Sequence, residues 1–280
     1  MSTRFSASLA LCATAVILLL SSCSSGPEAP QPGTPAFYHA AAIETWKSGD
    51  YLKTLDNLGN ITGSDNEFTE KARPWAIVTA AGIARGYSDL GDAWELGMRI
   101  NHAKAGDMRR QIGAYRAAAN STIMQLAETW QKFTAVNKQQ PVQFVFTWPP
   151  VGSQGTPSQL ALIQKGNPSG LSQAGLVETA MLQRGVVLAV AQSTGSDDDT
   201  AKAQVLFRQA TPAIPVADFE MGMAQCMFDL AAVYGPMKLD MPNRRDMLYN
   251  FALDAAKRHP GRKDATALAD KIQKAMKKKV

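Results

Sequence analysis

Cysteine and histidine are the side chains best suited to nucleophilic or metal chemistry, and both are rare in this chain. Its 280 residues include three of each, none with the spacing of a zinc or other metal site. No nucleophile elbow, phosphate-binding loop or dinucleotide-binding glycine motif occurs. Residues 197–199 are all aspartate, but they lack the alternating ligands and central glycine of a calcium loop and are expected to begin a helix. The sequence therefore predicts no catalytic residue, no metal site and no cofactor.

Cys23 is the one residue to which the sequence assigns a chemical role. An apolar stretch at residues 9–20 follows Arg4, and Leu20-Ser21-Ser22 directly precedes Cys23. The apolar stretch is too short and too interrupted for a membrane-spanning helix, which needs about 20 apolar residues, and it has the organisation of an export signal. Leu-Ser-Ser-Cys resembles the lipobox of bacterial lipoproteins. That resemblance implies that the Cys23 thiol receives a diacylglycerol, that residues 1–22 are a signal peptide cut off directly in front of Cys23, and that the new amine is then acylated.

The alternative is an ordinary secretory signal, cut at the same small residues with Cys23 incidental. Ser24, rather than aspartate, follows the cysteine. By the sorting rule of enteric-type bacteria, the lipoprotein resemblance then implies attachment to the outer membrane, with the body facing the periplasm. Residues 23–35 are rich in proline, glycine and serine, a composition that favours an extended tether of about 3.1 Å per residue.

The composition of the remaining body is that of a globular protein, with 45% hydrophobic residues over the whole chain. Once Cys12 leaves with the signal peptide and Cys23 carries lipid, only Cys226 remains, so no intramolecular disulfide is expected. The net charge of +5 is concentrated in a lysine-rich C-terminus. This tail is interpreted as a solvated helix end, with contact to anionic lipid or acidic polymer as the alternative; nucleic acid is not an expected partner. The lysines concerned are Lys271, Lys274, Lys277, Lys278 and Lys279.

Apolar residues spaced three or four apart predict an all-α fold for nearly the whole body. An N-terminal helical region at 36–137 and a C-terminal helical region at 158–280 are expected, separated by an extended aromatic and proline-glycine segment at 138–157. The predicted helices are 36–48, 51–58, 67–90, 93–103, 108–137, 158–165, 171–192, 197–209, 216–234, 243–259 and 263–278.

Two helix-to-helix turns are predicted from glycine-aspartate pairs. Gly49-Asp50-Tyr51 follows Trp46, and Gly91-Asp92 follows Ala84 and Tyr87. Both resemble the turn of tetratricopeptide-like repeats, although the two turns are 42 residues apart rather than the 34 of a regular repeat. The resemblance implies helical hairpins stacked as a tetratricopeptide-like solenoid or an irregular helical array, with a surface suited to a protein partner.

Phe144, Phe146 and Trp148 alternate with other residues near 142–148, which is the spacing of a strand. One interpretation is that this aromatic side packs on neighbouring helices. The other is an exposed edge that receives a partner strand or touches lipid, which makes the three residues candidate partner-binding residues.

Six methionines gather around Cys226. Core packing is the favoured interpretation, because methionine fills irregular gaps, and a soft-metal or peptide groove is the alternative. The methionines are Met221, Met223, Met227, Met237, Met241 and Met247.

The sequence thus favours a non-enzymatic role. We expect a lipoprotein anchored through Cys23, whose helical surface binds a protein of the cell envelope. Two alternatives stay open: a cell-wall-active enzyme or its activator, with catalytic carboxylates hidden among the helices, and a carrier of a small apolar ligand.

Overall fold

The computed structural model describes residues 30–136, 141–150, 156–168, 174–197, 199–209 and 211–277. The expected signal peptide, Cys23 and most of the expected tether lie outside these residues. The described chain is an array of mutually packed helices with one two-stranded sheet, and 76% of the described residues are helical. The predicted all-α class is therefore confirmed.

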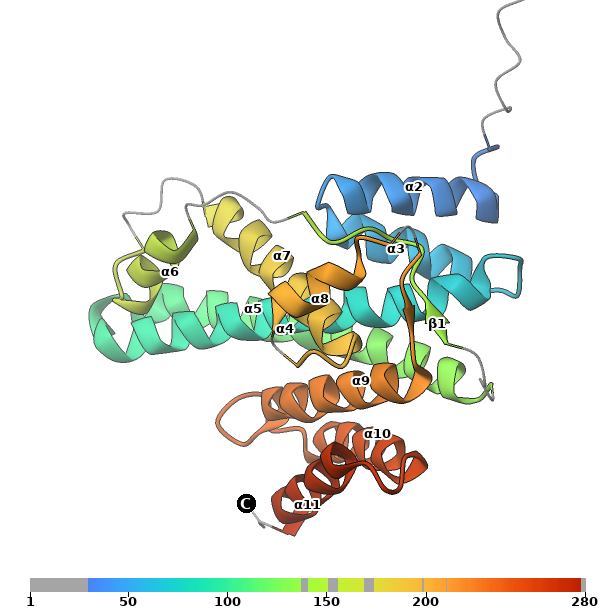
Figure 1. The fold of residues 1–280 in the computed structure, drawn as a ribbon. Coiled ribbons are helices and arrows are strands. Elements are labelled where there is room, and N and C mark those ends of the chain that lie inside the picture. Colours follow the sequence, from blue (N-terminus) through green and yellow to red (C-terminus); the bar gives the residue numbers. More distant parts are fainter. Residues whose placement is uncertain are drawn as a thin grey trace, which may run out of the picture.

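The elements follow the chain in a simple order (Figure 1). The α-helices are α2 (Pro35–Lys47), α3 (Tyr51–Thr62), α4 (Thr69–Ile100), α5 (Ala105–Thr134), α6 (Thr156–Gln164), α7 (Ala174–Ser193), α8 (Thr200–Leu206), α9 (Val216–Leu230), α10 (Pro242–Arg258) and α11 (Lys263–Lys277). Two short 3₁₀ helices are η1 (His102–Lys104) and η3 (Ala231–Tyr234), and the strands are β1 (Val142–Gln143) and β2 (Ala213–Ile214).

The first predicted turn is confirmed. Gly49 has φ +75°, a left-handed conformation that glycine adopts without steric cost. Asp50 then caps α3, its side chain accepting a hydrogen bond from the backbone N–H of Lys53 at 3.2 Å. Helices α2 and α3 therefore form a hairpin.

The second predicted turn is wrong. Gly91 and Asp92 lie inside α4, which continues without a break from Thr69 to Ile100, so the helices expected at 67–90 and 93–103 are one. A Cβ atom on Gly91 would lie 3.5 Å from the Cγ of Arg116 on α5. That distance is an ordinary van der Waals contact, so Gly91 is neither a turn residue nor needed for close packing. The stacked-repeat solenoid is not confirmed.

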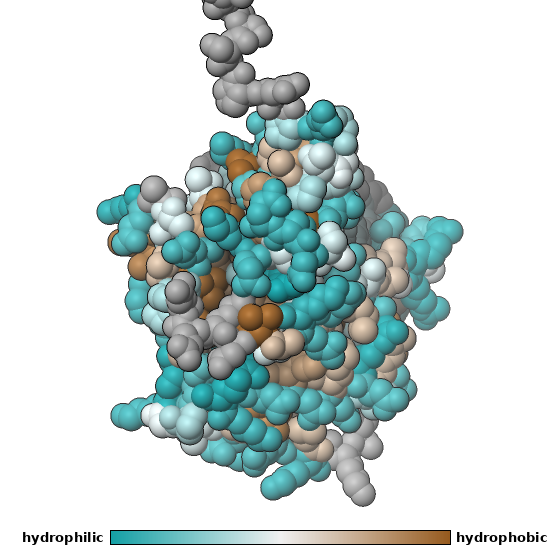
Figure 2. Space-filling model, turned by 90° about the vertical axis from the view of Figure 1, so that its right-hand side faces the viewer, coloured by the Kyte–Doolittle hydropathy of each residue, from teal (hydrophilic) through white to brown (hydrophobic). Residues whose placement is uncertain are grey.

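Helix α4 is the centre of the array. It packs against α3, α5, α6, α7 and α9, and its middle is buried over several successive turns. In Figure 1 the α2–α3 hairpin lies on one side of the α4–α5 pair, and α9, α10 and α11 follow one another on the other side. The hydrophobic side chains collect between these layers. The face drawn in Figure 2 is mainly hydrophilic, with small groups of hydrophobic residues.

Glycines bring α4, α7 and α9 into backbone contact. A Cβ atom on Gly185 of α7 would lie 2.1 Å from the carbonyl oxygen of Gly82 and 2.9 Å from the nitrogen of Gly86, both on α4. A Cβ atom on Gly222 of α9 would lie 1.8 Å from the carbonyl oxygen of Gln192, near the end of α7. No real Cβ atom fits at such distances, so these glycines set the spacing of the three helices.

Replacing Gly185 with alanine is expected to lower the free energy of unfolding by about 2–4 kcal/mol, because the added methyl forces two backbones apart. Gly113→Ala is the matched control: Gly113 is also inside a helix, but nothing lies within 4 Å of its added Cβ. This control should stabilise by up to about 1 kcal/mol through helix propensity. Urea unfolding followed by circular dichroism measures both, and equal effects of the two substitutions would contradict the close contact.

An aromatic contact holds α2 on the body. The His39 ring stacks on Phe68 with centroids 4.5 Å apart and meets Trp75 edge-on at 6.4 Å. Its Nε2 atom is buried and has no hydrogen-bond partner among the described residues. Burial, with a smaller contribution from the positive charge of Lys71, lowers the pKa of His39 from 6.5. Protonation of this ring is therefore linked to unfolding.

Replacing His39 with phenylalanine should make the protein less sensitive to acid. The unfolded chain takes up the proton at the ordinary pKa of 6.5 and the folded chain only at lower pH, so the stability contributed by neutral His39 falls as the pH drops below about 6.5. Chemical unfolding at about pH 7.5 and about pH 5.5 measures the difference. His102→Phe, at an exposed histidine, is the control and should keep the wild-type pH dependence. A His39→Phe variant as acid-sensitive as wild type would contradict the assignment.

Candidate functional site

The aromatic segment is part of the core. Phe144 and Phe146 are buried and stack on each other at 4.7 Å, and Phe146 also contacts Trp46 at 4.5 Å. Trp148 is half-buried and meets Phe207 edge-on at 5.5 Å. This burial favours the packing interpretation of residues 142–148. The alternative, an exposed aromatic edge, is not seen at Phe144 and Phe146, which are covered by neighbouring rings, whereas Trp148 remains partly accessible.

The extended segment has a partner strand that the sequence did not predict. Only Val142 and Gln143 form β1, which pairs antiparallel with β2 in the register Val142↔Ile214 and Gln143↔Ala213. Further along, the indole N–H of Trp46 donates to the carbonyl oxygen of Thr147 at 2.9 Å. The segment thus links α2 to the region before α9.

The methionine cluster divides into two parts. Met221, Met223 and Met227 are buried on α9, as core packing predicts, whereas Met237 is 77% exposed. No group of three or more histidine, cysteine, aspartate or glutamate side chains is placed to hold a metal ion within the described chain.

The lysine-rich tail is exposed as far as the structure describes it. On α11, Lys271, Lys274 and Lys277 are exposed; Lys278 and Lys279 lie outside the described residues.

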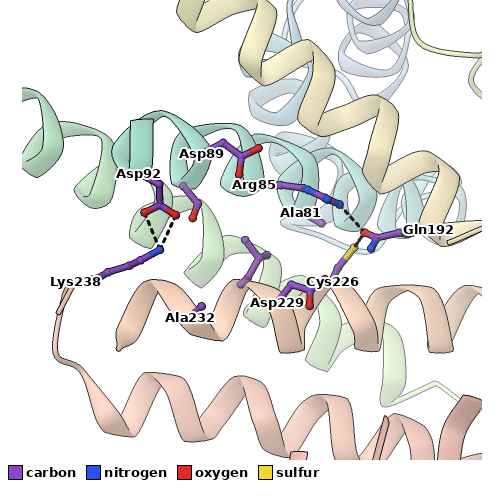
Figure 3. Close-up of a pocket in the computed structure, with 11 residues that line it drawn as sticks. Ala81, Arg85, Asp89, Asp92, Gln192, Cys226, Asp229, Ala232 and Lys238 are labelled. Carbon is purple, nitrogen blue, oxygen red and sulfur yellow. Dashed lines mark hydrogen bonds and ion pairs between the residues drawn. The ribbon is translucent and has the colours of Figure 1, made fainter. Parts of the chain in front are cut away.

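A polar pocket of about 220 Å³ lies between α4, the end of α7, and α9 with the loop that follows it. Figure 3 shows its two walls: α4 along one side and α9 with η3 along the other. The lining residues are Ala81, Arg85, Ser88, Asp89, Asp92, Gln192, Cys226, Asp229, Leu230, Ala232 and Lys238.

Gln192 organises one end of this pocket. Its Oε1 atom accepts hydrogen bonds from Nη1 of Arg85 at 3.2 Å and from the thiol of Cys226 at 2.6 Å (Figure 3). The carboxamide is 5% exposed. Two donors on one atom fix which end of the amide is the oxygen, so the amide group is held in one orientation.

An ion pair lies at the other end of the pocket. Nζ of Lys238, in the loop between η3 and α10, lies 2.7 Å from Oδ1 of Asp92 on α4 (Figure 3). This contact connects the loop to the central helix across the rim of the pocket.

Asp89 lies on α4 between these two ends (Figure 3). Burial raises the pKa of its carboxyl above 3.8, and Asp92 acts in the same direction, whereas Arg85, Arg184 and Lys238 oppose the rise. A partly desolvated carboxyl in a pocket is a common property of binding and catalytic sites. No role for Asp89 is predicted from the sequence.

A signal for this pocket was present in the sequence. Arg85, Asp89 and Asp92 are spaced by four and three residues on one face of α4, directly after its apolar middle. The interpretation of Gly91-Asp92 as a turn divided this helix and concealed the polar row.

Two open grooves run beside α5. The α3–α5 groove, of about 490 Å³, is lined by residues of α3, α4 and α5, and the α5–α10 groove, of about 500 Å³, by residues of α5 and by Met247 of α10. Gln125 and Glu128 line both grooves and form a ridge between them. The remaining α5 side chains that line one groove are Asn120, Ser121, Met124, Ala127, Thr129, Gln131 and Lys132.

The chain matches no protein-family model, and no curated protein and no solved structure matches it. Among the described helices, none is long and apolar enough to cross a lipid bilayer.

Proposed function

We propose that this chain is a bacterial lipoprotein, anchored in a membrane of the cell envelope through lipidated Cys23, whose helical body binds a protein partner without catalysing a reaction. The outer membrane, with the body in the periplasm, is the proposed location. The two grooves beside α5 are the observation that supports the binding role, because together they make a continuous uncovered surface on one long helix.

The chemistry of this surface suits an uncharged polypeptide segment. Seven of its 17 lining residues carry an amide or a hydroxyl, groups that both donate and accept hydrogen bonds. Met124 and Met247 add adaptable apolar area. The charge of Glu128 is paired with Lys132 at 2.8 Å. A partner that brings backbone amides and small apolar side chains would satisfy these groups.

The described pockets give less support to an apolar-ligand carrier. Each is lined by charged or amide side chains, and an apolar ligand would leave these groups without hydrogen bonds. The raised pKa of Asp89 is the one observation that favours an enzyme or its activator. Two other candidate groups of the pocket are engaged, because the Cys226 thiol donates to Gln192 and Asp92 pairs with Lys238, so the non-enzymatic role remains the proposal.

The anchor predicts that Cys23 carries lipid. Cells grown with radiolabelled palmitate should yield a labelled wild-type protein, which partitions into the detergent phase. A Cys23→Ala variant should lose both the label and the membrane association. The acyl chains on Cys23 supply the free energy of membrane binding, about 0.8 kcal/mol per buried methylene, and the variant cannot carry them. Cys226→Ala is the control and should remain labelled. Palmitate incorporation that persists in Cys23→Ala would overturn the anchor.

The binding surface predicts site-specific crosslinking. A photoreactive amino acid in place of Gln125, on the ridge between the grooves, should give one discrete larger adduct in the intact cell. The same amino acid in place of Gln273, an exposed glutamine on α11, is the matched control and should give none. An adduct pattern that is identical at both positions, or no adduct at Gln125, would contradict the proposal.

A further inference from the structure

The polar pocket between α4, α7 and α9 contains hydrogen-bonding groups that the fold itself does not use. Oε1 of Gln192 is occupied by Arg85 and Cys226. Its Nε2 atom is consequently turned away from both donors, and it makes no hydrogen bond to any described residue. Gln192 as a residue is 5% exposed and lines the pocket, and its Nε2 atom is not one of the fully buried polar atoms that lack a partner, so this donor is accessible to a ligand in the pocket.

Asp89 is the second such group. Its carboxylate makes no side-chain hydrogen bond or close ion pair within the described part of the chain. The cations that line the same pocket are engaged elsewhere: Arg85 binds Gln192 at 3.2 Å, and Lys238 binds Asp92 at 2.7 Å. The pocket therefore presents one acceptor, Asp89, and one donor, the Gln192 amide, to whatever enters it.

The charge of the lining selects between classes of ligand. Three carboxylates, Asp89, Asp92 and Asp229, line the pocket with two cations, Arg85 and Lys238. Arg184 also acts on Asp89 from outside the lining, but none of these cations forms a close ion pair with Asp89 in the described part of the chain. An anion would approach Asp89 against like charge, whereas an ammonium group would pair with it. Charge-assisted hydrogen bonds of this kind are about twice as strong as neutral ones.

The volume limits the size of the ligand. About 220 Å³ is smaller than the roughly 300–1,000 Å³ of pockets that hold drug-sized molecules. The rim is narrowed by the Lys238–Asp92 ion pair, so a compact molecule fits better than a polymer.

We propose that this pocket binds a small organic ammonium compound, with Asp89 accepting from the ammonium group and the Gln192 amide donating to an oxygen of the same molecule. Ser88, which also lines the pocket, adds a hydroxyl that can donate or accept. This site is separate from the α5 grooves, and it does not depend on the function proposed for them.

Matched pairs of ligands test the ammonium requirement. Alaninamide and lactamide, and glucosamine and glucose, differ only by an ammonium group in place of a hydroxyl. The full chain in detergent is titrated calorimetrically with each compound up to about 10 mM. At least one ammonium compound should bind, and the affinity for its hydroxyl counterpart should be at least tenfold lower.

Two variants locate the binding. Asp89→Asn keeps the size of the side chain and removes its charge, so it should lower the affinity for the ammonium compound at least tenfold. Asp254→Asn changes an exposed aspartate of α10, and it should leave binding unchanged. Unfolding midpoints of both variants establish that the body remains folded; if Asp89→Asn proved unstable, Gln192→Leu tests the donor in its place.

Three results would overturn the proposal. The first is that no ammonium compound of the panel binds. The second is that the hydroxyl counterparts bind equally well. The third is that a folded Asp89→Asn or Gln192→Leu variant binds as tightly as the wild type.

Discussion

The close approach of three helix backbones is the constraint on which the rest of the structure depends. Gly82 and Gly86 of α4 face Gly185 of α7, and Gly222 of α9 faces the carbonyl oxygen of Gln192. Helices normally pack 8–10 Å apart, and glycine at the crossing allows the shorter distances. This spacing brings Gln192 within 2.6 Å of Cys226 on α9, so one end of the polar pocket is formed by the same contacts that assemble the core.

Local sequence signals predicted the helices well. Thr34 caps α2, Asp50 caps α3 and Asp199 caps α8, and the helix expected at 243–259 is found as α10 at Pro242–Arg258. These signals act over one or two turns, so they can be read without knowledge of the fold. The regular apolar spacing of residues 108–137 likewise corresponds to α5.

The predictions from the sequence were wrong or missing where the role of a residue depends on its tertiary contacts. The pair Gly91-Asp92 is typical of a turn, but it lies inside α4, which continues through it and packs on α5. Strand β2 has two residues, too few for an alternating pattern to be recognised. The pocket needs Asp89 of α4, Gln192 of α7 and Cys226 of α9 together, and nothing local in the chain relates these positions. These three positions come together only at the helix spacing that the glycines set.

The chain enters and leaves the described body at opposite ends. Figure 1 shows α2 at the end where the N-terminal segment arrives and α11 at the other end, beyond α9 and α10. The α10–α11 hairpin therefore lies at the end of the described body away from α2. The exposed lysines of α11 give that end a positive charge, so a partner that contacts both α2 and these lysines must span the whole helical array.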